Sequence, residues 1–240
     1  MRALQIAATG MSAQQMRVEV ISNNLANMST TGYNPRRAEF ADLQYQQATR
    51  PGTITATNGA MVPAGVQLGL GVRPAAVTVM LGQGTLSQTN GDLDVAIDGQ
   101  GYLEVTLPSG VSAYTRDGSL KRSAEGQVVT SDGYPLVPDI TIPQDARSIA
   151  INANGEVFAY FNDRVEPENL GQITLANFVN EKGLEAIGSN LFLETTASGA
   201  PQVASPGEEG LGTIRAGYLE ESSVDPVREV AELIKAQRGY

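Results

Sequence analysis

The chain has 240 residues, 41% of them hydrophobic, and a formal net charge of −10 at pH 7. This apolar content supports a folded chain with a core, and the acidic balance argues against nucleic acid or an anionic membrane surface as a partner. Cys, His and Trp are absent, which removes disulfides, thiolate metal sites and the commonest general base. No apolar run approaches the roughly 20 residues of a membrane-spanning helix, so we expect no direct membrane insertion.

Residues 1–33 predict an amphipathic helix that runs into an Asn-rich stop. Residues recur every seven positions, for about four heptads, at the two seam positions of a coiled coil, which are the positions that face a partner helix. They are occupied by Leu4, Ala7, Met11, Gln14, Val18, Ile21, Leu25 and Met28. A stripe this long and narrow indicates packing against other helices. Polar side chains interrupt it before the apolar segment of a secretion signal forms, so we expect it to remain in the mature protein.

Residues 34–76 predict an extended connector. Asn34-Pro35 enforces an extended backbone, and residues 38–47 are compatible with either a short strand or a helix. Residues 48–76 are poor in charge and rich in Gly, Pro and Thr, as flexible linkers are. They also carry more apolar side chains than a solvated linker. We therefore expect them to be ordered against another surface, for which a neighbouring subunit is one candidate.

Residues 77–213 predict an antiparallel β domain, because short alternating runs are separated by turn dipeptides. The hairpin signals are Asn90-Gly91, Asp98-Gly99, Asp117-Gly118, Asp132-Gly133 and Asn154-Gly155. The candidate strands are residues 93–97, 101–107, 112–115, 126–130, 148–153, 156–161, 173–179 and 191–196. Together with helices at both ends, this predicts a mainly β, α+β fold.

Residues 214–240 lead into the start of a second helix. Asp225 suits the N-cap and Pro226 the first helical position. Its apolar stripe is Val227, Val230, Ala231 and Ile234. No C-cap signal precedes Tyr240, so the helical pattern is expected to be cut off there. We expect the two terminal helices to pair as a coiled-coil-like inner core on assembly.

Catalytic chemistry is not indicated by any motif. The acidic run that begins at Asp92 lacks the ligands of a calcium loop at its later positions, and no pair is singled out among 26 acidic residues. A serine nucleophile would have no histidine as its base. We therefore predict a protein that is not an enzyme and that has no cofactor, catalytic site or metal site.

Residues 3–33 resemble the N-terminal signature of the bacterial flagellar axial proteins, which comprise rod, hook and hook-associated proteins. The residues that carry the resemblance are Thr9, Gly10, Gln14, Gln15, Asn23, Asn24, Leu25, Asn27, Gly32 and Tyr33. Within the family, residues 36–46, 69–73, 83–105, 113–120, 173–201 and 217–240 are most similar to the distal rod branch.

Two departures from the family pattern stand out. Asp225-Pro226 occupies a place where the family more often has Asn and an aliphatic residue. Relatives also continue for several helical turns past the position of Tyr240, so the expectation is either a truncated chain or a shortened pairing of the terminal helices.

The resemblance implies a structural subunit of the rigid, tubular distal rod, which transmits torque from motor to hook and encloses the export channel. The implied partners are further copies of the chain in a helical homopolymer, other rod proteins, the hook protein and the surrounding P- and L-ring proteins. The implied location is the basal body, where the rod crosses the periplasm to the outer membrane. Export would use the flagellar type III apparatus without a cleaved signal peptide.

The stretch of about residues 46–65 is implied to stiffen the rod. Its candidate residues are Gln46, Arg50, Pro51, Ile54, Met61, Val62 and Pro63. Two alternatives to a distal rod subunit remain. One is another axial subunit of the proximal rod or hook, although residues 46–65 and the modest length argue against the hook. The other is a secreted β-domain binding module with oligomerising helical ends, which would form a small closed oligomer instead of an open polymer.

Overall fold

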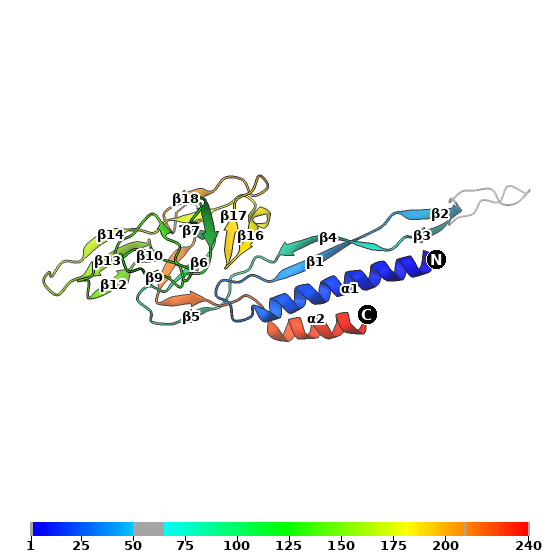
Figure 1. Ribbon diagram of the computed structural model, residues 1–240, viewed down its shortest axis with the longest axis horizontal. Coiled ribbons are helices and arrows are strands. Elements are labelled where there is room, and N and C mark those ends of the chain that lie inside the picture. The colour runs from blue at the N-terminus through cyan, green and yellow to red at the C-terminus, as the bar shows by residue number, and fades with distance from the viewer. Residues whose placement is uncertain (1, 50–64, 209, 240) are drawn as a thin grey trace, which may run out of the picture. The chain divides into compact units, whose positions relative to one another are not determined.

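A computed structural model describes residues 2–49, 65–208 and 210–239 (Figure 1). The chain forms two compact units, and each contains segments that are distant in the sequence. Unit 1 consists of Met1–Ala26, Arg36–Met80 and Asp225–Tyr240, and unit 2 consists of Asn27–Pro35 and Leu81–Val224. Both helices therefore belong to unit 1.

Unit 1 combines two helices with a two-stranded antiparallel ribbon. The helices are α1 (Arg2–Ala26) and α2 (Pro226–Arg238). The ribbon pairs β1 (Arg36–Asp42) with β4 (Val72–Val79) and β2 (Tyr45–Thr49) with β3 (Val66–Gly69). Residues 38–47, for which sequence left strand and helix open, thus contribute to strands. The described part of residues 48–76 is ordered against this chain's own strands.

The helix boundaries follow local capping chemistry. α1 ends at Ala26, and the residues that follow it form turns instead of continuing the helix to residue 33. α2 begins where the sequence predicted, since the Asp225 carboxylate accepts hydrogen bonds from the backbone N–H groups of Val227 (3.0 Å) and Arg228 (3.2 Å). The predicted N-cap is therefore confirmed.

Unit 2 is built from antiparallel sheets, which confirms the mainly β, α+β fold class. The largest sheet follows the order β16 (Glu185–Gly188), β17 (Leu191–Leu193), β8 (Ser112–Thr115), β7 (Tyr102–Thr106), β15 (Leu175–Asn177) and β18 (Gln202–Ala204), and β11 (Leu136–Val137) also pairs with β7. A second sheet has the order β12 (Ser148–Ile151), β13 (Glu156–Tyr160) and β14 (Glu168–Gln172).

Three strand pairs and a short helix complete the described part of unit 2. The pairs are β5 (Leu86–Gln88) with β20 (Tyr218–Glu220), β6 (Val95–Asp98) with β19 (Thr213–Ala216), and β9 (Lys121–Arg122) with β10 (Val128–Val129). The 3₁₀ helix is η1 (Glu181–Gly183).

The largest sheet is covered on both faces, because side chains alternate along each strand. On β7, Leu103 and Val105 join the main core, whereas Tyr102 joins a smaller aromatic cluster with Tyr114 and Phe178. The Tyr114 and Phe178 rings meet edge to face, with centroids 4.8 Å apart. Unit 2 therefore has a closed core of its own.

The hairpin predictions succeed only in part. Asn154-Gly155 turns the chain between the paired strands β12 and β13, and Asp132-Gly133 closes a turn around the bridge between Val129 and Pro135. The other three predictions are wrong, because β5 and β6 pair with the distant strands β20 and β19, and β8 does not pair with β9. The turn dipeptide reverses the backbone locally, whereas burial of apolar side chains selects the partner strand.

Candidate assembly surfaces of the terminal segments

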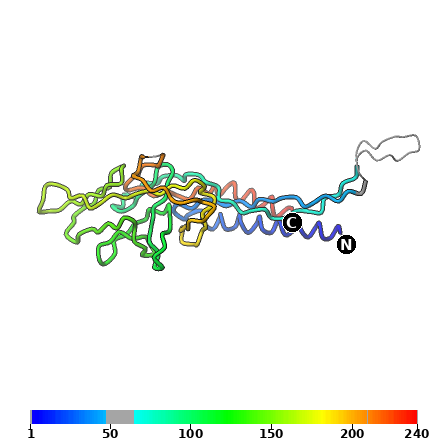
Figure 2. Tube along the Cα trace, turned by 90° about the horizontal axis from the view of Figure 1, so that it is seen from above, coloured from blue at the N-terminus to red at the C-terminus, as the bar shows by residue number. Residues whose placement is uncertain are grey.

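The two helices of unit 1 lie side by side and antiparallel (Figures 1 and 2). Asn24 contacts Glu229, whereas a Cβ placed on Gly239, at the end of α2, would lie 3.7 Å from the side chain of Gln14, which is earlier in α1. Contacting residues therefore run in opposite directions along the two helices. α2 covers the C-terminal part of α1, and the first turns of α1 extend beyond it.

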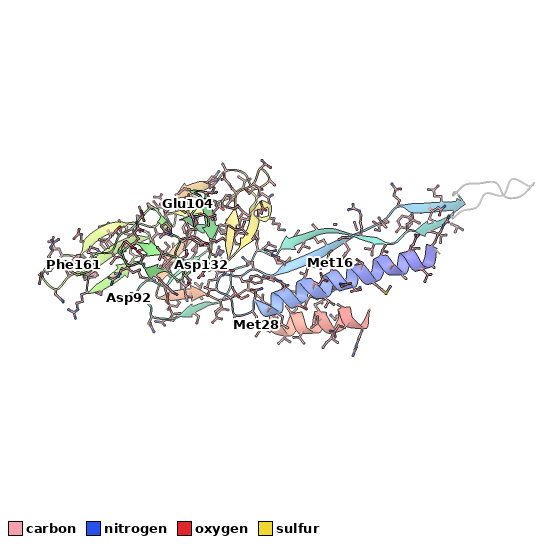
Figure 3. All side chains as sticks on the ribbon, in the orientation of Figure 1. Met16, Met28, Asp92, Glu104, Asp132 and Phe161 are labelled. Atoms are coloured by element: carbon pink, nitrogen blue, oxygen red, sulfur yellow. The ribbon has the colours of Figure 1, made fainter. Side chains whose placement is uncertain are left out.

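The predicted packing stripe of α1 is only partly buried within the chain. Ile21 is buried, and Gln14, Val18 and Leu25 are half-buried. Leu4, Ala7 and Met11 are exposed, with Leu4 reaching 72% exposure. Met28 was predicted to belong to the stripe, but it lies beyond the end of α1 in a turn, because the helix stops at Ala26. Figure 3 shows the side chains that project from α1 on either side of Met16. The burial of the exposed members against other subunits stays a prediction.

The predicted stripe of α2 faces away from the rest of unit 1. Val227, Val230, Ala231 and Ile234 are all exposed, with Val227 at 80% and Ile234 at 47%. The more buried positions of α2 are Glu229, Glu232, Leu233 and Ala236. α2 therefore uses one face inside the chain and leaves a separate apolar face without cover from the described residues.

Polar contacts that the sequence did not reveal join the two helices. The Arg17 guanidinium pairs with the Glu232 carboxylate, and the Asn24 amide donates to Glu229 Oε2 at 3.2 Å. Hydrogen bonds from Lys235 and Arg17 hold the pKa of Glu232 below its usual value. The partners lie more than 200 residues apart, so no local pattern identifies them.

Gln14 is a polar residue at a seam position, as the sequence indicated. Its Oε1 atom is buried and has no hydrogen-bond partner among the described residues. A buried carbonyl without a donor costs about 1–3 kcal/mol. A single polar residue in an otherwise apolar seam is also the device by which helix bundles set their register.

The end of the N-terminal motif is held within unit 2. Gly32 has φ +65° and donates its N–H to the Glu220 carbonyl at 2.8 Å. The Thr31 carbonyl accepts from Asn190 Nδ2 at 3.0 Å, and the Tyr33 carbonyl accepts from the Ser223 N–H at 3.1 Å. A Cβ at position 32 would lie 3.0 Å from the Arg116 carbonyl, so both conformation and space favour glycine there.

A buried ion pair joins Arg116 and Glu220, the two residues against which Gly32 lies. Arg116 and Glu220 have side chains only 8% and 3% exposed, and Arg116 Nη2 lies 2.9 Å from Glu220 Oε2. Arg116 also donates to the carbonyls of Gly99 and Gly101, both at 3.1 Å. Glu220 Oε1 accepts from the Gly84 N–H at 2.9 Å. Each charge is therefore paired and hydrogen-bonded, as buried charges require.

Burial also perturbs two tyrosines of the aromatic cluster. Burial, together with the neighbouring Glu181 carboxylate, raises the pKa of Tyr102, whose hydroxyl donates to Glu181 Oε2 at 3.0 Å. Burial, with Glu104 and Glu194 as lesser causes, raises the pKa of Tyr114 to about 12. Both phenols therefore remain neutral at physiological pH and pack as part of the core.

The region around Glu181 also forms a hollow of about 270 Å³, lined by Leu81, Gln100 and residues 177–182. Among the described residues, no three His, Cys, Asp or Glu side chains gather as a metal site. None of the described helices has the length and apolar character to cross a membrane.

Most of the predicted stiffening residues cannot be placed. Arg50, Pro51, Ile54, Met61, Val62 and Pro63 lie outside the described residues. Gln46 lies on β2, where its side chain is exposed and accepts a hydrogen bond from Arg2 Nη1 at 2.8 Å.

Three protein-family models match three separate parts of the chain. Residues 4–34 match the model described as flagella basal body rod protein. Residues 96–159 match the flagellar hook protein FlgE/F/G D1 domain, and residues 215–240 match the flagellar basal body rod FlgEFG protein C-terminal model. The N-terminal segment, part of the β domain and the C-terminal segment thus place the chain in the flagellar rod and hook class.

Individual relatives narrow this class. The chain is 52% identical over 240 residues to the flagellar basal-body rod protein FlgG of Caulobacter vibrioides, covering 100% of this chain and 92% of the relative. It is 48% identical to FlgG of Agrobacterium fabrum with the same coverage. It is 46% identical over 242 residues to FlgG of Borreliella burgdorferi, covering 100% of this chain and 91% of that protein. The chain belongs to the FlgG family of flagellar basal-body rod proteins.

Proposed function

We propose that this chain is the structural subunit of the distal part of the flagellar rod, where it polymerises into a rigid helical tube. The observation that carries the proposal is the exposed apolar stripe on α2, together with the exposed first half of the α1 stripe. Unit 2 has a closed core of its own. In contrast, α1 and α2 of unit 1 carry apolar faces that the described residues do not cover. Faces of this kind indicate a protein interface.

The exposed apolar side chains of α1 and α2 favour an open polymer. Burying one large aliphatic side chain contributes about 1.5–3 kcal/mol, so residues such as Leu4, Val227 and Ile234 offer a substantial driving force. The exposed stripes on α1 and α2 are different surfaces. Contact between two different surfaces is heterologous, and a heterologous contact that does not close into a ring produces a helical filament.

The finer parts of the proposal follow from the family. The terminal helices would form the inner layer around the export channel, and unit 2 the outer layer. The partners would be other rod proteins, the hook protein and the P- and L-ring proteins, with the rod crossing the periplasm after type III export. The stretch around residues 46–65 would stiffen the tube. Torque transmission requires no catalysis, cofactor or metal.

The proposal is tested by deleting the gene and imaging isolated basal bodies by electron microscopy. We expect rods that stop before their distal part and lack hooks, with complete rods restored by the wild-type gene. Complete rods and normal hooks in the deletion strain would contradict the distal rod assignment.

A point substitution tests the exposed stripe of α2. Replacing Ile234 with glutamate should change the free energy of unfolding of the single chain by no more than about 0.5 kcal/mol, because the side chain is exposed. It should raise the concentration at which the purified chain polymerises by about tenfold or more, because the charge would be buried in the interface. Polymer formation is measured by sedimentation.

The matched control is Arg228→Gln, which makes the same change of one charge unit at an exposed position of α2 outside the predicted stripe. We expect it to polymerise like the wild type. Equal loss of polymerisation in both variants would indicate a general charge effect, and unchanged polymerisation of Ile234→Glu would exclude the stripe as an interface.

A further inference from the structure

Glu220, the last residue of β20, is bonded to segments of unit 2 that are distant from it in the sequence. Its backbone carbonyl accepts the N–H of Gly32 at 2.8 Å, and its Oε1 atom accepts the N–H of Gly84 at 2.9 Å. Its Oε2 atom lies 3.0 Å from Nε and 2.9 Å from Nη2 of Arg116. The side chain is only 3% exposed. One buried residue therefore holds two backbone segments and one cation.

The bonded segments are those by which the chain continues from unit 2 into unit 1. We define three connecting segments, which are residues 27–35, 81–84 and 220–224. Gly32 lies in the first, Gly84 ends the second and Glu220 begins the third. A Cβ on Gly84 would overlap the carbonyl oxygen of Glu221, so the second connecting segment lies directly against the third. All three connecting segments therefore meet at Glu220.

Arg116 joins Glu220 to the core of unit 2. It directly follows β8, and its guanidinium donates to the carbonyls of Gly99 and Gly101, between β6 and β7, both at 3.1 Å. The guanidinium carbon lies 5.9 Å from the centre of the Tyr102 ring, which is within the range of a cation–π contact. β7 and β8 are neighbours in the largest sheet. The ion pair therefore links the connecting segments to two central strands.

Net stability does not explain why a charged pair occupies this position. Apolar side chains of similar volume often stabilise a core equally well, because a buried ion pair must first lose its hydration. Such side chains lack directional bonds. The guanidinium presents five N–H donors in a fixed plane, and the carboxylate accepts on both of its oxygens. The pair therefore fixes where each connecting segment lies, which apolar packing alone would not do.

We propose that Arg116 and Glu220 are positioning residues that anchor the three connecting segments to the core of unit 2, so that force on the terminal segments of an assembled subunit reaches the β sheets through this ion pair. This inference rests on the proposed function, because a rod that transmits torque subjects every subunit to such force. The anchor lies wholly within unit 2, so it requires no order in α1 or α2 before subunits join.

Two variants of the full-length chain perturb the anchor from its two sides. Arg116→Lys keeps the positive charge but loses the planar fork, because an ammonium group is a point charge on a flexible stem. We expect the lysine to pair with Glu220 and to leave the carbonyls of Gly99 and Gly101 without their full set of donors. Glu220→Asp keeps the negative charge, but its shorter side chain cannot reach Gly84 and Arg116 together.

The matched control is Val157→Ala, which removes buried methyl groups from β13 without removing a hydrogen bond. Val157 is 2% exposed and belongs to the main core of unit 2. We expect this variant and Arg116→Lys each to lower the unfolding temperature of the purified chain by about 4–8 °C. Similar losses of stability, with and without damage to the anchor, separate positioning from general weakening of the fold.

Hydrogen exchange of the purified full-length chain measures the anchor directly. In Arg116→Lys and Glu220→Asp, the amides of residues 84–88 and 218–220 should exchange at least about tenfold faster relative to those of β12 and β13, because local opening is governed by local contacts. In Val157→Ala this ratio should stay within about twofold of the wild-type ratio. An unchanged ratio in both anchor variants, or the same increase in Val157→Ala, would overturn the proposal.

A second measurement increases the load on the assembled rod. Each variant is expressed in a strain that lacks the gene, the cells swim in medium thickened with an inert polymer, and the released filaments that carry hooks are counted per cell. We expect Arg116→Lys to release them at least about fivefold more often than the wild type, because its connecting segments yield under torque. Val157→Ala should resemble the wild type. Equal release in all three strains would overturn the proposal.

The two measurements also distinguish a failure of the anchor from a failure of the proposed function. If the wild-type gene does not restore rods, the chain is not the distal rod subunit, whereas the exchange ratio still decides whether Arg116 and Glu220 anchor the connecting segments. Restored rods together with an unchanged exchange ratio would contradict the anchor alone.

Discussion

Replacing Arg116 with methionine is expected to lower the free energy of unfolding of unit 2 by about 3–5 kcal/mol, the usual cost of removing one partner from a buried ion pair. Glu220 would remain buried with an uncompensated charge, and the carbonyls of Gly99 and Gly101 would lose their donor. The measurement is chemical denaturation of the purified chain, followed by a probe of β structure.

Arg215→Met provides the matched control for this variant. Arg215 pairs with Asp98 at 2.7 Å, but the two side chains are 52% and 36% exposed. Because exposed pairs contribute about 0–1 kcal/mol, we expect a small change. Similar losses in both variants would show that the buried pair does not stabilise unit 2 in the way its hydrogen bonds indicate.

The second large effect is expected from two N-terminal deletions that differ by only a few residues. Removing residues 2–26 should abolish polymerisation, because it removes α1, and should leave unit 2 folded. Removing residues 2–33 should also destabilise unit 2, by about 2–3 kcal/mol at roughly 1 kcal/mol for each lost hydrogen bond. The lost bonds are those made by Thr31, Gly32 and Tyr33.

Thermal unfolding and sedimentation of the two purified proteins distinguish these outcomes. Retained polymerisation in either deletion would contradict the role of α1. Equal unfolding temperatures for the two deletions would show that residues 27–33 add nothing to unit 2. The comparison also separates the contribution of α1 from that of residues 27–33, although the sequence pattern predicts a single segment over residues 1–33.

The assembly residues were only partly predictable. Seam periodicity selected Val230 and Ile234 on α2, and the structure leaves both exposed. The same periodicity gave no indication that Glu229 and Glu232 face α1, because their partners Asn24 and Arg17 lie about 200 positions away in the sequence. The N-terminal motif identified Asn24 and Gly32 as residues that resemble the family pattern, but it did not indicate which residues they contact.

Several features of this protein were predictable from the amino-acid sequence alone: an α-helix near each end, the Asp225 N-cap, the alternating strands and the family. These features follow from periodicity and capping, which act over a few residues and are therefore visible in the chain. Three further features became visible in the folded chain: β6 pairs with β19 instead of its neighbour, Gly32 hydrogen-bonds to Glu220, and Arg116 is buried with Glu220. These choices depend on which distant segments bury apolar surface together and satisfy buried charges, and no local pattern records that outcome.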